Sequence, residues 1–422
     1  MVKQMQKTPQ ADRLQIALFG RRNTGKSSII NALTGQQVAL VSEIPGTTTD
    51  PVVKAMELGK LGPVLFIDTA GLDDEGTLGE LRIAKSRAVL GRTDLILMVI
   101  EAEAKISELE EELVQTAKER QIPLIAVINK IDRLSDEQKK SVDSEIRNNV
   151  AELKAWFKRK KLPAVAVSAL TGEGIERLKD VIIEVRPDSQ RPQSLLGGLL
   201  EPGKKETAIL VCPIDKAAPK GRLILPQVQT IRAALDMRAK AFVVTEKELS
   251  SALEGLKAPP SLVITDSQVF NTVASIVPET IPLTSFSIIY ARYKGDLWTF
   301  VEGAQKIDTL QGGEKILIAE ACTHRPIEED IGRVKIPGLL EKRVGAKLDF
   351  SWSVGGDFPE NLDEYQLVIH CGGCMISRAA VLQRLRVVKN AGVPVVNYGV
   401  CLAYLNGILE RVIKPFRISV PD

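Results

Sequence analysis

The stretch Ile16-Ala17-Leu18-Phe19-Gly20-Arg21-Arg22-Asn23-Thr24-Gly25-Lys26-Ser27 decides the fold of the first part of this chain. A short apolar run leads into a glycine loop, and residues 28–33 continue with a helical pattern. Strand, glycine loop and helix in this order are the context of a P-loop, whose backbone N–H groups surround a phosphate chain. Lys26 is placed to reach the terminal phosphates and the Ser27 hydroxyl to ligate magnesium. A plain glycine turn before a helix would explain neither side chain.

Three further motifs follow in order, each after an apolar run that reads as a strand. Asp68-Thr69-Ala70-Gly71 offers a carboxylate to magnesium and a glycine N–H to the γ-phosphate. Asn129-Lys130-Ile131-Asp132 offers the Asp132 carboxylate, which can accept two hydrogen bonds that guanine donates and adenine cannot. Ser168-Ala169-Leu170 is similar to the loop that backs the guanine. The four motifs together predict a GTPase domain built on a mostly parallel, open α/β sheet.

The way in which this domain activates water must differ from that of Ras-like proteins, because Leu72 stands where those carry a glutamine. Asn23 and the segment Pro45-Gly46-Thr47-Thr48-Thr49-Asp50 resemble the TrmE-Era-EngA group of GTPases. The resemblance implies that Asn23 holds a potassium ion in place of an arginine finger, and that Thr48 closes on magnesium. As a plain alternative, Asn23 is a turn residue. We expect GTP hydrolysis to be stimulated by potassium.

The GTPase motifs therefore give three sets of predicted site residues. Those expected to bind GTP are Gly20, Asn23, Thr24, Gly25, Lys26, Ser27, Ser28, Asn129, Lys130, Asp132, Ser168 and Ala169. Those expected to act in hydrolysis are Lys26, Asn23, Thr48, Asp68 and Gly71. Magnesium is expected on Ser27, Thr48 and Asp68.

Length and composition set limits on the rest of the chain. Its 422 residues are enough for roughly three domains. A net charge of +3 and 4% aromatic residues give no support for nucleic-acid binding. Residues 1–13 lack the apolar core of a secretory signal, and the uncharged residues 391–409 read as a buried strand and helix. We therefore expect a cytoplasmic protein that does not enter a membrane, with its five cysteines as thiols or metal ligands.

Domain boundaries are indicated by proline, glycine and polar residues. Residues 186–192 are a proline-containing polar run, and the apolar residues of 195–200 are expected to dock onto their own chain. An alternating strand and helix pattern follows, and residues 286–304 predict one amphipathic helix. The predicted order is a P-loop GTPase domain (1–186), a linker (187–206), an α/β dimerisation or scaffold domain (207–283) and a C-terminal α/β metal-binding domain (284–422).

The C-terminal domain carries a set of cysteines and histidines. Predicted strands at 315–319 and 366–369 lead towards Cys322 and directly into His370-Cys371-Gly372-Gly373-Cys374. Parallel strands place both segments at one edge of a sheet. Three thiolates suit either a zinc site completed by a histidine or an iron-sulfur cluster with one iron not held by cysteine. The spacing alone does not choose between them, and a redox pair of Cys371 and Cys374 leaves Cys322 unexplained.

The whole chain resembles the HydF family of FeFe-hydrogenase maturation GTPases, through its potassium-type GTPase motifs and its Cys-x-His and His-Cys-x-x-Cys segments. The resemblance implies a 4Fe-4S cluster on Cys322, Cys371 and Cys374 with an exchangeable fourth iron site. His324 and His370 match family positions as a ligand or as donors behind the ligands. The implied role is a scaffold or carrier for a transient di-iron precursor, with GTP, Mg²⁺ and K⁺ as further cofactors.

The same resemblance implies three partners: the FeFe-hydrogenase apoprotein and the radical SAM maturases HydE and HydG. It also implies a homodimer. The alternative from another class is a GTPase of tRNA modification or ribosome assembly, with a C-terminal domain stabilised by zinc. The low net charge and the few aromatic residues count against that alternative.

Overall fold

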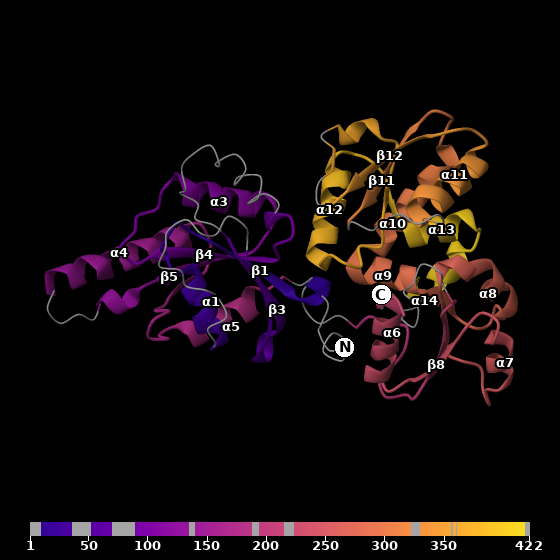
Figure 1. The fold of residues 1–422 in the computed structure, drawn as a ribbon, viewed down its shortest axis with the longest axis horizontal. Helices are drawn as coiled ribbons and strands as arrows, with labels where there is room; N and C mark the ends of the chain where they lie inside the picture. The colour runs from indigo at the N-terminus through magenta and orange to yellow at the C-terminus, as the bar shows by residue number, and fades with distance from the viewer. Residues whose placement is uncertain are drawn as a thin grey trace. The chain divides into compact units, whose positions relative to one another are not determined.

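The computed structural model divides the chain into two compact units, Met1–Arg191 and Pro192–Asp422 (Figure 1). It describes residues 10–35, 52–69, 89–134, 140–187, 194–214, 223–321, 330–355, 358–359 and 361–417. Four predicted site residues therefore lie outside the described residues: Thr48, Gly71, Cys322 and His324. The four predicted domain ranges stay predictions.

The first unit is built on a six-stranded sheet in the order β2-β3-β1-β4-β5-β6. Its strands are β1 (Leu14–Phe19), β2 (Val52–Leu58), β3 (Gly62–Asp68), β4 (Leu95–Glu101), β5 (Leu124–Asn129) and β6 (Ala164–Ala166). Neighbouring strands are parallel, except that the edge strand β2 runs antiparallel to β3. The P-loop, the Asp68 motif and the Asn129 motif consequently meet at the carboxyl edge of β1, β3 and β5.

Helices cover both faces of this sheet. They are α1 (Lys26–Thr34), α3 (Glu108–Glu119), α4 (Lys140–Arg159) and α5 (Ile175–Val185). Successive residues of a strand point to opposite faces, so β1 contributes Ile16 and Leu18 to a core with α1 and α5, and Ala17 and Phe19 to a second core with α3 and α4. Figure 1 shows α3 on the other side of the strands from α1 and α5. The predicted open α/β sheet is confirmed.

The second unit contains two four-stranded parallel sheets, in the orders β10-β9-β7-β8 and β12-β11-β13-β14. The first has β7 (Thr207–Val211), β8 (Lys240–Val244), β9 (Leu262–Thr265) and β10 (Leu283–Ser285). The second has β11 (Lys315–Glu320), β12 (Asp349–Val354), β13 (Leu367–His370) and β14 (Val395–Asn397). Both sheets contribute to one continuous hydrophobic core.

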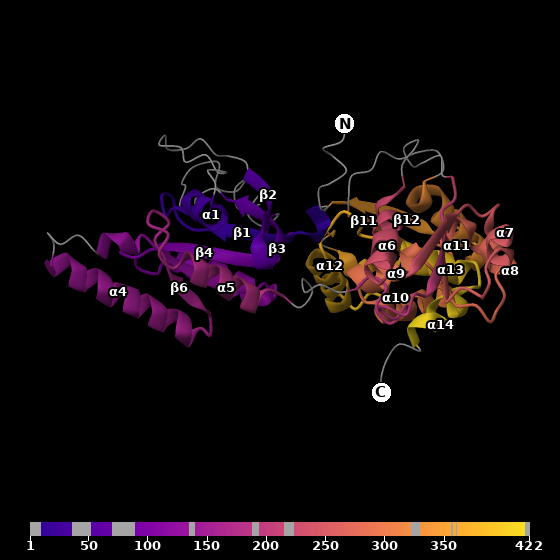
Figure 2. The ribbon, with the colours of Figure 1, turned by 90° about the horizontal axis from the view of Figure 1, so that it is seen from below.

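Helices join the two sheets of this unit. They are α6 (Leu225–Asp236), α7 (Leu249–Glu254), α8 (Phe270–Ile276), α9 (Phe286–Lys294), α10 (Leu297–Gln305), α11 (Ile336–Val344), α12 (Arg378–Asn390), α13 (Tyr398–Leu405) and α14 (Leu409–Arg417). Helix α9 packs against α6 beside the first sheet and against α12 and α13 beside the second. Figure 2 shows α9 next to α6 and α10.

Two local expectations can be compared with this arrangement. The apolar stretch at 195–200 docks onto its own chain as expected, because Leu195, Leu196 and Leu200 are buried in the core of the second unit. The single helix expected over 286–304 is wrong: α9 stops before Gly295, and the Asp296 side chain caps α10 by accepting hydrogen bonds from the backbone of Trp298 and Thr299. Among the described residues, no helix has the length and apolar character needed to span a bilayer.

Candidate functional site

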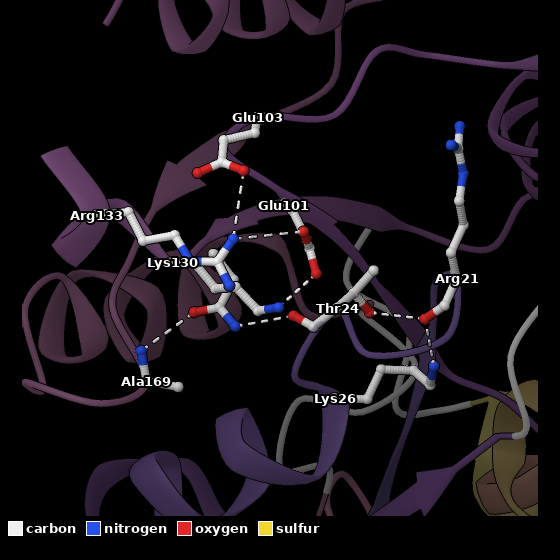
Figure 3. A network of polar contacts seen from close by, with 9 residues as sticks. Arg21, Thr24, Lys26, Glu101, Glu103, Lys130, Arg133 and Ala169 are labelled. Atoms are coloured by element: carbon white, nitrogen blue, oxygen red, sulfur yellow. Dashed lines mark hydrogen bonds and ion pairs between the residues drawn. The ribbon is translucent and has the colours of Figure 1, made fainter. Parts of the chain in front are cut away.

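The P-loop follows β1 and opens α1. Asn23 adopts a left-handed backbone conformation with φ of 60°, which asparagine tolerates, and its side chain is exposed. Lys26 is buried, and its Nζ donates hydrogen bonds of 2.9 Å to the carbonyl oxygens of Gly20 and Arg21. Figure 3 shows the second of these bonds. The ammonium is therefore held inside the loop, where a phosphate chain binds in P-loop proteins.

The predicted magnesium ligands Ser27 and Asp68 are in direct contact. The Ser27 hydroxyl donates a 2.5 Å hydrogen bond to Oδ2 of Asp68, at the end of β3. Burial raises the pKa of Asp68, against the Ser27 hydrogen bond and the Lys26 charge, which lower it. A hydroxyl and a carboxylate oxygen placed together are ligands that Mg²⁺ accepts, usually beside phosphate oxygens and water.

The predicted guanine-binding residues also lie together. The Asn129 amide donates to the carbonyl of Thr24 in the P-loop at 2.9 Å and accepts from the backbone N–H of Ala169 at 3.1 Å (Figure 3). The Ser168 hydroxyl donates to Oδ1 of Asp132 at 2.6 Å, which orients the carboxylate that is expected to select guanine. Asn129 thus ties the phosphate loop to the base-binding loops.

Two contacts beside this site were not predicted from the sequence. Lys130 pairs with Glu101, at the end of β4, and Arg133 pairs with Glu103 at 3.3 Å. Arg21 donates from Nε and Nη2 to both oxygens of the buried Glu110 on α3, at 2.9 and 2.8 Å. These partners are distant in sequence, and no motif connects them.

The cysteine segments meet at the carboxyl edge of the second sheet of Pro192–Asp422, as expected. β11 and β13 are parallel neighbours with Ala319 opposite His370. The backbone N–H of Cys371 donates to the Ala319 carbonyl at 2.9 Å, and that of Ala321 donates to the Cys371 sulfur at 3.1 Å. The chain leading to Cys322 therefore passes beside Cys371.

Cys371 and Cys374 are both free, half-buried thiols. Gly373 lies between them with φ of 61°, a conformation that favours glycine and turns the chain. Burial, and then the charge of Cys371, raise the pKa of Cys374. Within the described ranges, which leave out Cys322 and His324, no three His, Cys, Asp or Glu side chains form a metal-binding group.

The donor set at this edge fits a thiolate-bound metal group. Two thiols converge there, and one sulfur already accepts a backbone N–H. The buried hydroxyl of Tyr398, which follows β14, has no hydrogen-bond partner among the described residues. Unpaired buried hydroxyls are uncommon, and they are explained by a bound group more readily than by packing.

His370 has both ring nitrogens engaged. Nε of Arg384, on α12, donates to Nε2 of His370 at 2.8 Å. Nε2 must then be the acceptor, so Nδ1 carries the proton and donates to the Cys371 carbonyl at 2.6 Å. Burial lowers the pKa of His370 and keeps the ring neutral. This arrangement favours His370 as a support for the cysteine loop over His370 as a direct ligand.

The sequence contained a signal for Arg384 that was not used. In α12 the buried positions include Val381, Arg384, Leu385 and Val388, so the arginine lies on the apolar face of the helix. A charged residue at such a position needs a buried partner. Its partners, His370 and the Gly355 carbonyl at 2.8 Å, become visible only in the fold.

The fold and the nucleotide site define a P-loop GTPase, and the family model of the 50S ribosome-binding GTPase matches residues 15–130. Models of the hydrogen maturase F dimerization domain and tetramerization domain match residues 195–295 and 298–415. The chain belongs to the hydrogen maturase F, or HydF, family. Its GTPase domain is of the type found in TrmE, Era and Der. The two oligomerisation domains support self-association.

Similar proteins share the GTPase part of the chain. GTPase Der of Kosmotoga olearia is 35% identical over 196 residues, 45% of this chain and 43% of that protein. The tRNA modification GTPase MnmE of Moorella thermoacetica is 32% identical over 197 residues, 46% of this chain and 38% of that protein. The chain thus spans less than half the length of these relatives. A crystal structure of Aquifex aeolicus Era is 21% identical with a TM-score of 0.36, covering 55% of this chain and 93% of Era.

Proposed function

We propose that this protein is a GTP-hydrolysing scaffold or carrier for assembly of the di-iron subcluster of FeFe-hydrogenase, holding a 4Fe-4S cluster on Cys322, Cys371 and Cys374. The observation that carries the proposal is the pairing of β11 with β13 in a domain matched by the hydrogen maturase F model. This pairing brings the Cys322 segment to the side of Cys371. Family membership and the GTPase domain supply the other half.

When bound, the cluster supplies an iron with an exchangeable position to which a di-iron precursor can attach. The protein residues do the rest. Cys371 and Cys374 bind iron as thiolates, the Ala321 N–H donates to the Cys371 sulfur, and His370 holds the Cys371 carbonyl. His324 and His370 serve behind the ligands in this proposal.

The nucleotide site acts as a switch in this proposal. GTP binds with its phosphates on Lys26 and its base on Asp132, and Mg²⁺ bridges Ser27, Thr48 and Asp68 to the phosphates. K⁺ on Asn23 offsets the charge that develops during hydrolysis, since Leu72 replaces the usual glutamine. Hydrolysis then controls cluster loading or partner release through a change in the loops around the γ-phosphate.

The proposed partners are a second copy of the chain, the FeFe-hydrogenase apoprotein, HydE and HydG. The test is activation of the apoprotein by full-length protein purified from cells that express both maturases. Cys371→Ala is expected to abolish activation. Lys26→Ala is expected to keep the cluster but to lose GTP hydrolysis. Activation by the Cys371→Ala protein at the wild-type level would contradict the scaffold role.

Potassium stimulation is tested separately by GTP hydrolysis in matched KCl and NaCl buffers. The expected rate is about tenfold or more higher in KCl, since removal of one charge-stabilising group typically costs a factor of that order or above. Asn23→Ala should remove the difference between the salts. Equal rates of the wild-type protein in both salts would refute the potassium site.

A further inference from the structure

The Tyr398 hydroxyl is a buried donor at the edge where the cysteines lie. It has no hydrogen-bond partner among the described residues. Carboxylates close by are already used: Glu320 accepts from Arg333 at 3.2 Å, and Asp330 accepts from the Arg333 backbone N–H at 2.8 Å. A buried hydroxyl without a partner loses its water hydrogen bonds and gains nothing in return. The folded protein therefore keeps a donor at this place at a cost in stability.

The position of Tyr398 follows from strand register. β13 and β14 are parallel, with His370 opposite Asn397. The next residues along these strands are Cys371 and Tyr398, so both leave the sheet at the same level. The Cys371 thiol is close enough to raise the pKa of the Tyr398 hydroxyl, although burial is the largest cause.

The far end of the Tyr398 side chain can be located from Gly332, in a π-helical turn (Ile331–Lys335). A Cβ atom at Gly332 would lie 2.0 Å from the Tyr398 hydroxyl. The Gly332 carbonyl in turn accepts a 3.4 Å hydrogen bond from the Trp352 indole of β12. β12 and β14 are the two outer strands of this sheet. The tyrosine ring therefore reaches from β14 across the ends of β13 and β11, beneath the cysteine segments.

Gly332 makes room for the hydroxyl, and no larger residue fits there without moving it. A phenylalanine at position 398 would fill the same space without an unpaired donor. The chain thus provides a glycine for a tyrosine whose hydroxyl bonds to nothing in the described residues. A ligand-dependent partner explains this combination.

We propose that the Tyr398 hydroxyl donates a hydrogen bond to a sulfur of the group held by Cys371 and Cys374. This inference rests on the proposed function, because it needs a cluster at that edge. Iron-sulfur clusters gain negative charge when they are reduced, and a hydrogen bond to sulfur stabilises the reduced form. Tyr398 is therefore a residue that contacts the cluster and sets how readily it accepts an electron.

The test uses full-length protein with Tyr398→Phe, which removes one oxygen and keeps the ring. The matched control is Tyr404→Phe on the same helix, α13, because the Tyr404 hydroxyl already bonds to Asp308. After anaerobic reconstitution, redox titration followed by EPR measures the equilibrium constant for one-electron reduction. Tyr398→Phe should lower this constant about tenfold, and Tyr404→Phe should leave it unchanged.

A second measurement, on cluster-free protein, separates a ligand-directed hydroxyl from a structural one. Thermal unfolding of cluster-free Tyr398→Phe should occur at or above the wild-type temperature, because no protein bond is lost. Tyr404→Phe should unfold at a lower temperature. A lower unfolding temperature for cluster-free Tyr398→Phe would show a protein partner and overturn the inference.

The two levels of the proposal fail in different ways. If wild-type protein takes up a cluster and Tyr398→Phe reduces with the same constant, the inference about Tyr398 is overturned and the scaffold function stands. If wild-type protein takes up no cluster, the proposed function is overturned, and the inference falls with it.

Discussion

Arg384 is predicted to be the main support of the loop that carries Cys371, and its replacement by methionine tests this. The arginine is 6% exposed and its partner His370 is 1% exposed. Methionine keeps much of the apolar stem and removes the guanidinium. The bonds lost are those to Nε2 of His370 and to the Gly355 carbonyl, both 2.8 Å long, and a contact with the Phe358 ring at 4.4 Å.

The size of the effect follows from these contacts. Each of the two acceptors, once buried without a donor, costs about 1–3 kcal/mol, and the contact with the ring adds about 1 kcal/mol. Methionine avoids the desolvation of a buried guanidinium, which returns part of this loss. We expect the second unit to be destabilised by about 3 kcal/mol. For a unit of this size, that lowers its unfolding temperature by roughly 6–12 °C.

Tryptophan fluorescence can report the second unit alone. The three tryptophans are Trp156 in the first unit and Trp298 and Trp352 in the second. In a Trp156→Phe background, urea unfolding of the full chain gives the free energy of the second unit. Arg386→Met is the control, because Arg386 is exposed on the same helix.

The reasoning is refuted if Arg384→Met costs less than about 1 kcal/mol, or no more than Arg386→Met, since surface substitutions usually stay within about 0.5 kcal/mol. A second readout is the ¹⁵N NMR signal of His370 in cluster-free protein. It should show the proton on Nδ1 in wild type, and a mixture of tautomers in Arg384→Met.

Three further predictions concern other parts of the chain. Asp132→Asn should weaken GTP binding about 100-fold and improve XTP binding, because about 3 kcal/mol of hydrogen bonding to a charged acceptor is lost; competition with a fluorescent nucleotide measures it, and unchanged GTP affinity would contradict the assignment. Cys212 and Cys401, whose pKa values burial raises to about 12, should resist iodoacetamide at about pH 8 until the protein unfolds; mass spectrometry of the native protein checks this, and rapid labelling of either would be the opposite result. Burial raises the pKa of Glu110, but hydrogen bonds from Arg21 and a serine outweigh it and leave the pKa below 4.5. This carboxylate therefore contributes stability above about pH 4.5 that is lost as the pH falls through its folded pKa, and Glu110→Gln should remove about 1–2 kcal/mol of it in acid unfolding followed by circular dichroism.

The nucleotide site could be predicted from the sequence because its chemistry lies in short continuous motifs. Each motif follows an apolar run, so strand position and residue type agree. The structure brings Ser27 to Asp68 and Asn129 to Thr24, as this pattern requires. The same argument placed the cysteine segments at one sheet edge, because parallel strands leave little freedom there.

The supporting contacts could not be predicted, because they join residues that are distant in the chain. Arg21 meets Glu110 through packing of α3 against the sheet, and Tyr398 meets Gly332 across the strand ends. Such pairs depend on tertiary geometry, which periodicity does not give. The division of residues 286–304 into two helices was, by contrast, readable from Gly295 and Asp296, a helix stop followed by an N-cap residue.

The most direct test of the central claim is anaerobic reconstitution of the full-length protein with iron and sulfide, followed by metal analysis and visible absorption. The proposed function predicts a brown protein with about four iron and four sulfide atoms per chain, the composition of one 4Fe-4S cluster. Alanine in place of Cys322, Cys371 or Cys374 should abolish the absorption, and alanine in place of Cys401 should not. A colourless wild-type protein that instead retains one zinc ion per chain would contradict the account.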